Sequence, residues 1–326
     1  MRKRQSKAGT MGRRLKIIII VIVAALIIMA IKGIFFDSPE IGKFKSIDYQ
    51  NQYNQAYDDV LKSAPPDETY DIQTSFGIVR VYSWGNSSGV PMFLLPGHSS
   101  GAPMWIDNIN DFSKENRVYA IDALGDAGKS RQEVPLKDIN DVNTYIREVM
   151  DKLGLDKVNL VGHSFGGGYA SNFAIACPEK INTLVLLEPA FALNYPSASV
   201  MFWATVSSID FLPKSIRDYG LSQISNEDVS NISSDDPLAK MISIGSSGFE
   251  TELPTPKVLS EEEIMSFDIP VYVAVADNSL ITTDKTTERA ELFPKGRVKV
   301  YKNTTHSLPM EVSKELTDDL NEFWGK

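Results

Sequence analysis

The chain of 326 residues contains very little cysteine and histidine. Its single cysteine, Cys177, cannot form an internal disulfide and cannot supply a thiolate cluster. Disulfide scaffolds and cysteine-rich zinc modules are therefore excluded. The three histidines, His98, His163 and His306, are too few to suggest a multi-histidine metal centre, so we expect no bound metal.

Acidic residues are missing from residues 1–36, which carry eight lysines or arginines. The remaining chain from Asp37 onward holds 25 basic and 42 acidic residues, so the formal net charge of −9 hides a body of charge −17. Such an acidic body is a poor partner for nucleic acid, and we expect none to bind. The 43% apolar content describes a chain that buries a core.

A basic run precedes residues 17–31, which are all apolar. At 1.5 Å per residue this stretch covers only about 22 Å of a roughly 30 Å hydrocarbon layer, but residues 15–36 would reach about 33 Å because flanking lysines can snorkel. We therefore expect a transmembrane signal anchor through residues 15–36. The excess of positive charge then places the tail in the cytoplasm and the acidic body outside the cell membrane. The alternative is a cleaved signal peptide and a secreted body, although no clean small-x-small cleavage site follows.

From residue 70 the chain alternates short β-rich runs with helical patterns, which is typical of a doubly wound, mostly parallel α/β sheet. The first two of eight expected strands would form an antiparallel pair. The expected strands are 71–74, 77–84, 92–95, 117–121, 158–161, 183–187, 271–276 and 298–301, and the expected helices between and after them are 142–153, 168–176, 285–292 and 312–324.

About eighty residues separate the sixth strand from the seventh, which is too long for a simple connection. We interpret residues 190–269 as a small helical insertion, a cap over a site, with residues 37–189 and 270–326 as the core. Residues 37–68 read as a polar stalk or first helix. The apolar underside expected of the cap comprises Met201, Phe202, Trp203, Phe211, Tyr219 and Met241.

Residues 162–166 read Gly-His-Ser-Phe-Gly, directly after an expected strand and before an expected helix. This is the G-x-S-x-G pattern in the context that a nucleophile elbow requires. The turn is tight, so a side chain at either glycine would collide with the neighbouring strand and helix. We therefore predict that Ser164 projects its hydroxyl above the sheet as a nucleophile.

Here the chain, from about residue 70 to its carboxyl terminus, resembles the α/β-hydrolase superfamily, and specifically its cap-bearing members with a serine nucleophile. Residues 94–105 look like the family's oxyanion loop, with Pro96 where a histidine is usual. By that resemblance the N–H groups of His98 and Phe165 would form the oxyanion hole. Residues 122–130 are similar to the family's Asp-x-x-Gly-x-Gly-x-Ser loop, in which Asp122 is more often structural than catalytic.

The resemblance also places the catalytic base at His306, which follows the last expected strand and precedes the final helix. His163 lies inside the elbow and His98 in the oxyanion loop, so neither is placed to accept the proton of Ser164. We expect these two histidines to orient loops.

The triad acid is where the sequence departs from the family pattern, because Ser279 stands at the usual acid position after the seventh strand. Two carboxylates are the main candidates: Glu188, directly after the sixth strand, and Asp277, two residues before Ser279. We favour Glu188, since some family members take their acid from that strand end, and we keep Asp277 as the alternative. Asp284 is a third choice.

A serine nucleophile disfavours the dehalogenase and epoxide hydrolase branches, which use aspartate at the elbow. Acyl chemistry without a cofactor is implied, and hydrolysis of a small or apolar carboxylic ester is the default. A C–C bond hydrolase, a peptidase or a thioesterase of the same fold are alternatives. A further alternative, suggested by Ser279, is a membrane-tethered binding module without catalytic activity.

Overall fold

The computed structural model describes residues 40–209, 212–226 and 236–326. From Ile41 onward the chain forms one compact unit. The expected tail and membrane anchor, residues 1–36, and the cap residue Phe211 lie outside the described residues. Among the residues that are described, no helix combines the length and the apolar character needed to cross a bilayer.

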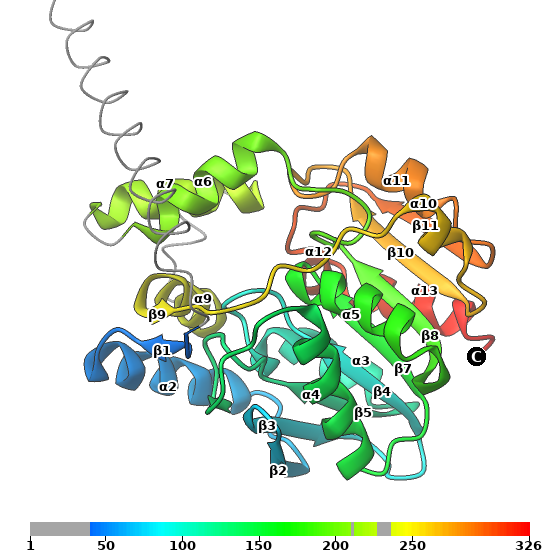
Figure 1. The fold of residues 1–326 in the computed structure, drawn as a ribbon, viewed down its shortest axis with the longest axis horizontal. Coiled ribbons are helices and arrows are strands. Elements are labelled where there is room, and N and C mark those ends of the chain that lie inside the picture. Colours follow the sequence, from blue (N-terminus) through cyan, green and yellow to red (C-terminus); the bar gives the residue numbers. More distant parts are fainter. Residues whose placement is uncertain (1–39, 210–211, 227–235) are drawn as a thin grey trace, which may run out of the picture. The chain divides into compact units, whose positions relative to one another are not determined.

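A mostly parallel sheet forms the centre of the molecule (Figure 1). Its strands follow the order β2-β3-β5-β4-β7-β8-β10-β11, and β6 pairs with β3. All pairs from β5 to β11 along this order are parallel, whereas β3 is antiparallel to both β2 and β5. Within the described residues, the nine strands of this sheet are β2 (Glu68–Thr74), β3 (Gly77–Trp84), β4 (Val90–Leu95), β5 (Asn116–Ile121), β6 (Arg131–Gln132), β7 (Val158–His163), β8 (Ile181–Leu187), β10 (Val271–Ala276) and β11 (Gly296–Tyr301).

The eight predicted strands are all present, and the opening antiparallel pair is confirmed. The prediction of eight strands was one too few, because β6 also joins the sheet through a two-residue pairing with the start of β3. A strand of two residues has no periodicity that a sequence pattern could reveal. For the same reason a second small sheet, β1 (Lys43–Phe44) paired with β9 (Phe249–Glu250), was not predicted.

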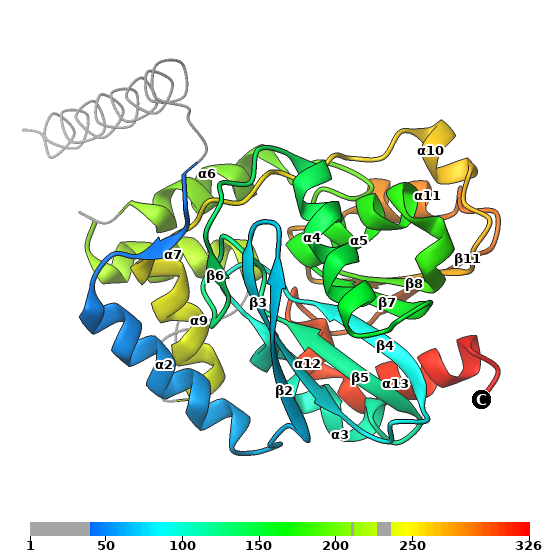
Figure 2. The same cartoon turned by 60° about the horizontal axis from the view of Figure 1, so that its bottom comes forward.

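Two apolar layers cover the two faces of the sheet, as alternation along a buried strand requires. In β4, Phe93 and Leu95 pack in one layer, and Met92 and Leu94 pack in the other. Figure 2 shows helices on both sides of the sheet. The first layer includes α4 (Ile139–Lys152), α5 (Phe165–Ala176), α10 (Glu261–Met265) and α11 (Asp284–Ala290); the second includes α2 (Ile47–Leu61), α3 (Ile106–Phe112), α12 (Leu308–Glu311) and α13 (Ser313–Phe323).

Helix α2, the first helix within the described residues, packs into the core and is not a polar stalk. It begins after Ser46, whose hydroxyl accepts the N–H of Tyr49 at 3.2 Å as an N-cap. Tyr53 and Tyr57, one turn apart, are fully buried, and the Tyr57 hydroxyl donates to the Asp122 carboxylate at 2.9 Å. The tyrosine spacing therefore marks the buried face of the helix.

The described part of the interval between β8 and β10 contains three longer helices, α6 (Ala198–Ser208), α7 (Lys214–Ser225) and α9 (Pro237–Gly248). Helix α6 packs mainly against α7, and α9 packs mainly against α2 (Figure 1). Of the apolar residues expected on its underside, Met241 is buried, whereas Met201, Phe202 and Tyr219 remain 38–46% exposed. The helical content is as expected, but much of its apolar surface does not pack on the core.

The nucleophile, the base and the two main candidate acids follow the carboxyl ends of parallel strands. Ser164 follows β7, Glu188 follows β8, Asp277 follows β10, and His306 lies in the loop after β11. The oxyanion loop begins directly after β4. Because parallel strands end at the same edge of a sheet, these loops meet where ligands bind in open α/β folds.

Candidate active site

Ser164 occupies a sharp turn between β7 and α5. Its backbone has φ 52° and ψ −121°, a strained conformation for a residue with a side chain. A Cβ atom at Gly162 would lie 2.3 Å from the carbonyl oxygen of Gly166, and one at Gly166 would lie 2.4 Å from that of Leu95. The turn therefore excludes side chains at both glycines, as the pattern predicts.

A continuous hydrogen-bonded chain joins Ser164, His306 and Glu188. Nε2 of His306 lies 2.8 Å from the Ser164 hydroxyl oxygen, and Nδ1 of His306 lies 3.2 Å from Oε2 of Glu188. Ser164 is half-buried and the His306 side chain is 14% exposed, so solvent reaches both. An activated nucleophile requires this geometry, with a base in contact and a third group that orients the base.

Glu188 is completely buried, and its backbone φ of 46° lies in the left-handed region. Its Oε1 accepts two short hydrogen bonds of 2.6 Å, one from the N–H of Ala276 and one from the hydroxyl of Thr282. The second oxygen, Oε2, faces His306. A carboxylate without water needs such partners, and here each oxygen has at least one.

Asp277, the other carboxylate predicted as a candidate, contacts different groups. Its Oδ1 accepts a long hydrogen bond of 3.4 Å from the Thr304 N–H, and its Oδ2 lies 3.8 Å from Nζ of Lys302. Within the described chain neither Asp277 nor Asp284, the first residue of α11, hydrogen-bonds to His306. The structure therefore brings Glu188 to His306 and leaves Asp277 and Asp284 apart from it.

Ser279, which replaces the acid of the family pattern, shapes the loop that supports Glu188. Its hydroxyl oxygen accepts the N–H groups of Ile281 at 3.0 Å and Thr282 at 3.4 Å. This turn directs the Thr282 hydroxyl onto Glu188. Thr282 was not predicted as a site residue, and no local sequence pattern marks it, because its contact with Glu188 depends on how the whole loop folds.

The oxyanion loop is held in place by a buried aspartate. Asp126 accepts the N–H of Ser99 at 2.7 Å, and the same carboxylate oxygen lies 3.1 Å from Nδ1 of the exposed His98 ring. The N–H groups of His98 and Phe165 have no acceptor among the described residues. Both are therefore available to an oxygen of a ligand, as an oxyanion hole requires.

The contact between His98 and Asp126 changes the pKa of both side chains. Partial desolvation opposes protonation of the His98 ring, but the Asp126 carboxylate outweighs it and raises the pKa of His98. Burial would raise the pKa of Asp126, but the charge of His98 and the hydrogen bonds it accepts lower it overall. The pair is thus an ion pair over a wider pH range than the two isolated side chains would give.

His163 contacts the loop that carries the proposed base, His306, and does not hydrogen-bond to the Ser164 hydroxyl. Burial, together with the nearby His306, lowers the pKa of His163 to about 3. The neutral ring donates its Nε2–H to the carbonyl oxygen of His306, at 2.9 Å. Its buried Nδ1 has no hydrogen-bond partner within the described residues.

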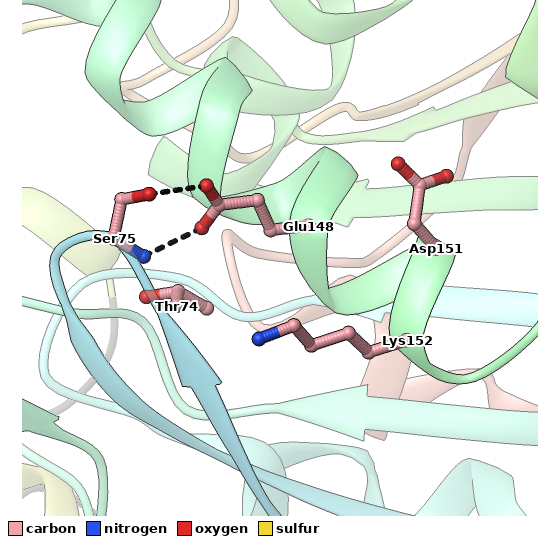
Figure 3. A pocket seen from close by; sticks show the side chains of 5 residues that line it. All are labelled: Thr74, Ser75, Glu148, Asp151 and Lys152. Carbon is pink, nitrogen blue, oxygen red and sulfur yellow. Dashed lines mark hydrogen bonds between the residues drawn. The ribbon is translucent and has the colours of Figure 1, made fainter.

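A separate surface hollow of about 410 Å³ lies at the turn between β2 and β3, beside α4 (Figure 3). The Glu148 carboxylate in this hollow already accepts the N–H of Ser75 at 2.7 Å and the Ser75 hydroxyl. The Lys152 ammonium is likewise bonded, to the carbonyl oxygen of Gln73. No candidate catalytic residue lines the hollow, and the described chain holds no cluster of three or more His, Cys, Asp or Glu suited to a metal.

The fold and the residues at the strand ends define a class of protein, and comparison with known families agrees. A family model described as "alpha/beta hydrolase fold" matches residues 90–311, about two thirds of the chain. The chain belongs to this family.

Among the curated proteins, the chain is similar to the carboxylesterase YbfK of Bacillus subtilis, with 25% identity over 288 residues covering 82% of this chain and 92% of the relative. It is 26% identical to an uncharacterized carboxylesterase, nap, of the same organism, over 84% of this chain and 92% of the relative. A crystal structure of naproxen esterase from Bacillus subtilis superposes with a TM-score of 0.78 at 26% identity, covering 86% of this chain and 99% of that one. With the family, these relatives identify the protein as a hydrolase.

Proposed function

We propose that the protein is a serine carboxylesterase in which Ser164 is the nucleophile, His306 the base and Glu188 the orienting acid. The observation that carries this proposal is the hydrogen-bonded chain from the Ser164 hydroxyl through both ring nitrogens of His306 to the Glu188 carboxylate. The names of the similar proteins, both carboxylesterases, support an ester as the substrate.

The mechanism follows from which nitrogen of the His306 ring carries a proton. The Glu188 carboxylate accepts a hydrogen bond from the Nδ1–H group of His306. Nε2 of the neutral ring therefore carries no proton and can accept the proton of Ser164. As the serine oxygen attacks the ester carbonyl, the oxygen that becomes negative binds the N–H groups of His98 and Phe165. Loss of one such donor typically costs about 3 kcal/mol of transition-state stabilisation.

Collapse of the tetrahedral intermediate releases the alcohol, which takes its proton from Nε2 of His306. The acyl group remains on Ser164 until water, deprotonated by the same nitrogen, attacks the carbonyl. The bond from the carbonyl carbon to the Ser164 oxygen then breaks, Nε2 returns the proton to that oxygen, and the carboxylic acid leaves. Both half-reactions therefore use one base and one oxyanion hole. Each step is an acyl transfer, and these five residues supply all of the groups it needs.

The first test is labelling of the full-length protein with a fluorophosphonate, which reacts with activated serines without requiring a known substrate. Labelling should be complete in the wild type and absent in Ser164→Ala. Ser171→Ala, which changes a serine on the same helix, serves as the matched control and should label normally if it folds. A folded wild-type protein that does not label would refute the esterase proposal.

We also propose that residues 15–36 anchor the protein in the cell membrane, with residues 1–14 cytoplasmic and the catalytic body outside. The support is the basic flank, the apolar run and the acidic body of the sequence. Extraction of membranes at alkaline pH tests this proposal, because an anchored protein stays in the pellet. Release of the body into the supernatant would favour a cleaved, secreted form.

The cap is a further part of the proposal. We assign residues 190–269 to it because they join strands β8 and β10 and carry α6, α7 and α9. Replacing residues 197–248 by a short glycine-serine linker should leave an unfolded or differently selective protein. Unchanged selectivity in a folded deletion variant would argue against a cap that shapes the site.

A further inference from the structure

Three aromatic rings form a row that begins at the nucleophile and ends at the surface. The ring of Phe165 meets that of Phe191 at a centroid distance of 5.7 Å, and Phe191 meets Tyr195 at 6.2 Å, both edge to face. Phe165 and Phe191 are half-buried, and Tyr195 is 69% exposed. The row is therefore a partly exposed aromatic surface that starts at the residue after Ser164 and becomes fully exposed at Tyr195.

Phe191 is held in a backbone conformation that its side chain does not favour. Its φ of 55° lies in the left-handed region, which is costly for a bulky aromatic residue. Hydrogen bonds fix the residues on both sides: the N–H of Ala190 donates to the carbonyl oxygen of Ser164, and the carbonyl oxygen of Ala192 accepts the N–H of Leu259, each at 2.9 Å. Strain that the surroundings impose in this way is concentrated at functional sites.

The segment that carries Phe191 is also packed tightly on the nucleophile helix. A Cβ atom at Gly168 of α5 would lie 2.6 Å from the carbonyl oxygen of Ala190, so only glycine allows this approach. On its other side Phe191 packs with Val200 of α6 and Ile281. The ring is thus fixed between the hydrolase core and the first helix of the cap.

The tetrahedral intermediate determines which part of an ester can reach this row. The leaving alcohol must lie at Nε2 of His306, which protonates it, and the oxyanion must lie at the N–H groups of His98 and Phe165. The remaining substituent of the carbonyl carbon is the acyl chain. Among the described residues, the ring of Phe165 contacts those of His98 in the oxyanion loop, Tyr169 of α5 and Phe191, whereas the ring of His306 contacts that of His163. The row thus begins on the oxyanion side of Ser164.

On the basis of the proposed esterase function, we infer that Phe165, Phe191 and Tyr195 form the acyl-binding surface, which selects esters of carboxylic acids that carry an aryl group. Aromatic rings favour edge-to-face and offset contacts with further rings, so an aryl group could extend the row. Phe191 and Tyr195 would then determine specificity without taking part in bond breaking.

The experiment compares two esters that share one leaving group, p-nitrophenyl acetate and p-nitrophenyl 3-phenylpropanoate, in the full-length protein. The readout is the ratio of their kcat/KM values, with active sites counted by fluorophosphonate titration so that misfolded protein does not contribute. The ratio should fall about tenfold in Tyr195→Ala and in Phe191→Leu, since the loss of a contact of this size typically changes selectivity by ten-fold or more.

Tyr219→Ala is the matched control, because Tyr219 of α7 is another exposed aromatic residue of the inserted region but stacks on Trp203 outside the row. Its ratio should equal that of the wild type. The rate at which the 3-phenylpropanoyl-enzyme is hydrolysed should change only in Tyr195→Ala and Phe191→Leu. At that stage the alcohol has already left, so a changed rate reports on the acyl group alone. An unchanged ratio in both row variants, or an equal fall in Tyr219→Ala, would overturn the inference.

A second pair, ethyl acetate and 2-phenylethyl acetate, varies the alcohol instead. If Tyr195→Ala changes this ratio and not the first, the row binds the leaving group and the acyl assignment is wrong. Failure of the esterase proposal itself looks different: the wild type would then neither label with the fluorophosphonate nor turn over p-nitrophenyl acetate.

Discussion

The substitution Glu188→Gln should disable the proposed triad without removing any side-chain volume. Oε1 of Glu188 accepts both the N–H of Ala276 and the hydroxyl of Thr282, each at 2.6 Å, so the carbonyl oxygen of a glutamine must take that place. The amide NH₂ then faces Nδ1 of His306 and donates to it. This forces the proton of the neutral imidazole onto Nε2, where it blocks acceptance of the Ser164 proton.

The magnitude follows from this change of tautomer. Holding a catalytic histidine in the wrong tautomer lowers kcat by on the order of 10⁴, which corresponds to about 5.5 kcal/mol. Asp277→Asn is the matched control, because that carboxylate accepts only a 3.4 Å hydrogen bond from Thr304 and lies 3.8 Å from Lys302. Its kcat should stay within a few-fold of the wild type.

The assay is turnover of p-nitrophenyl acetate per folded molecule, with the melting temperature of each variant as the folding control. Glu188→Gln should melt near the wild type, since the amide preserves the shape and two of the hydrogen bonds. A Glu188→Gln enzyme within tenfold of the wild type, together with a loss of more than 10³ in Asp277→Asn, would refute the assignment and place the acid on Asp277.

Three further results are expected. Thr282→Val should lower kcat about tenfold, because Glu188 loses one of two donors to Oε1, and Thr282→Ser should restore it; equal losses in both would deny the hydroxyl this role. His163→Gln keeps a donor but does not titrate. Because the folded-state pKa of His163 is lowered to about 3, only the unfolded wild type binds a proton as the pH falls from 6.5 towards 3. Over that range the wild type should lose about 1.4 kcal/mol of stability per pH unit that the variant keeps, and parallel urea-unfolding profiles would contradict this. Asp126→Asn should reduce the melting temperature most at pH 6. Because the pKa of His98 is raised in the folded protein, the stability that the His98–Asp126 ion pair contributes is complete below about pH 6.5 and is lost as the pH rises through the raised pKa. A difference in melting temperature that stays constant to pH 9 would exclude the ion pair.

The strands could be predicted from the sequence because most are buried on both faces and read as short, nearly continuous apolar runs. The start of α5 could not: three glycines, at positions 166–168, are poor helix formers, so the helix was expected from residue 168 although it begins at Phe165. Here tertiary packing decides, since Gly168 lies against the backbone of Ala190. Periodicity likewise could not show that Met201 and Phe202 stay exposed, because a local pattern does not say what covers a helix.

Some residues of the candidate site could likewise be predicted from the sequence, and others could not. Ser164 and His306 stand in local patterns that specify their surroundings, a strand-turn-helix in one case and the loop before the last helices in the other. No local pattern identifies the acid of the triad. Glu188 and Asp277 both carry a carboxylate and both follow a buried strand, so the sequence does not distinguish them. Only the fold shows that one carboxylate is buried within reach of His306 while the other faces Lys302.

Ser279, taken alone, suggested a hydrolase fold that had lost its acid and its activity. In the structure its hydroxyl oxygen accepts the N–H of Thr282, and Thr282 donates to the carboxylate of Glu188. The loop that supplies the acid in the family pattern thus supplies a hydroxyl donor to an acid at the end of the neighbouring strand β8. A protein that had only lost its acid would have no reason to place two 2.6 Å donors on a fully buried glutamate that also contacts His306. An acid at the end of β8, held by a donor from the loop after β10, accounts for the serine, the threonine and the buried glutamate together, and this argues for the proposed triad.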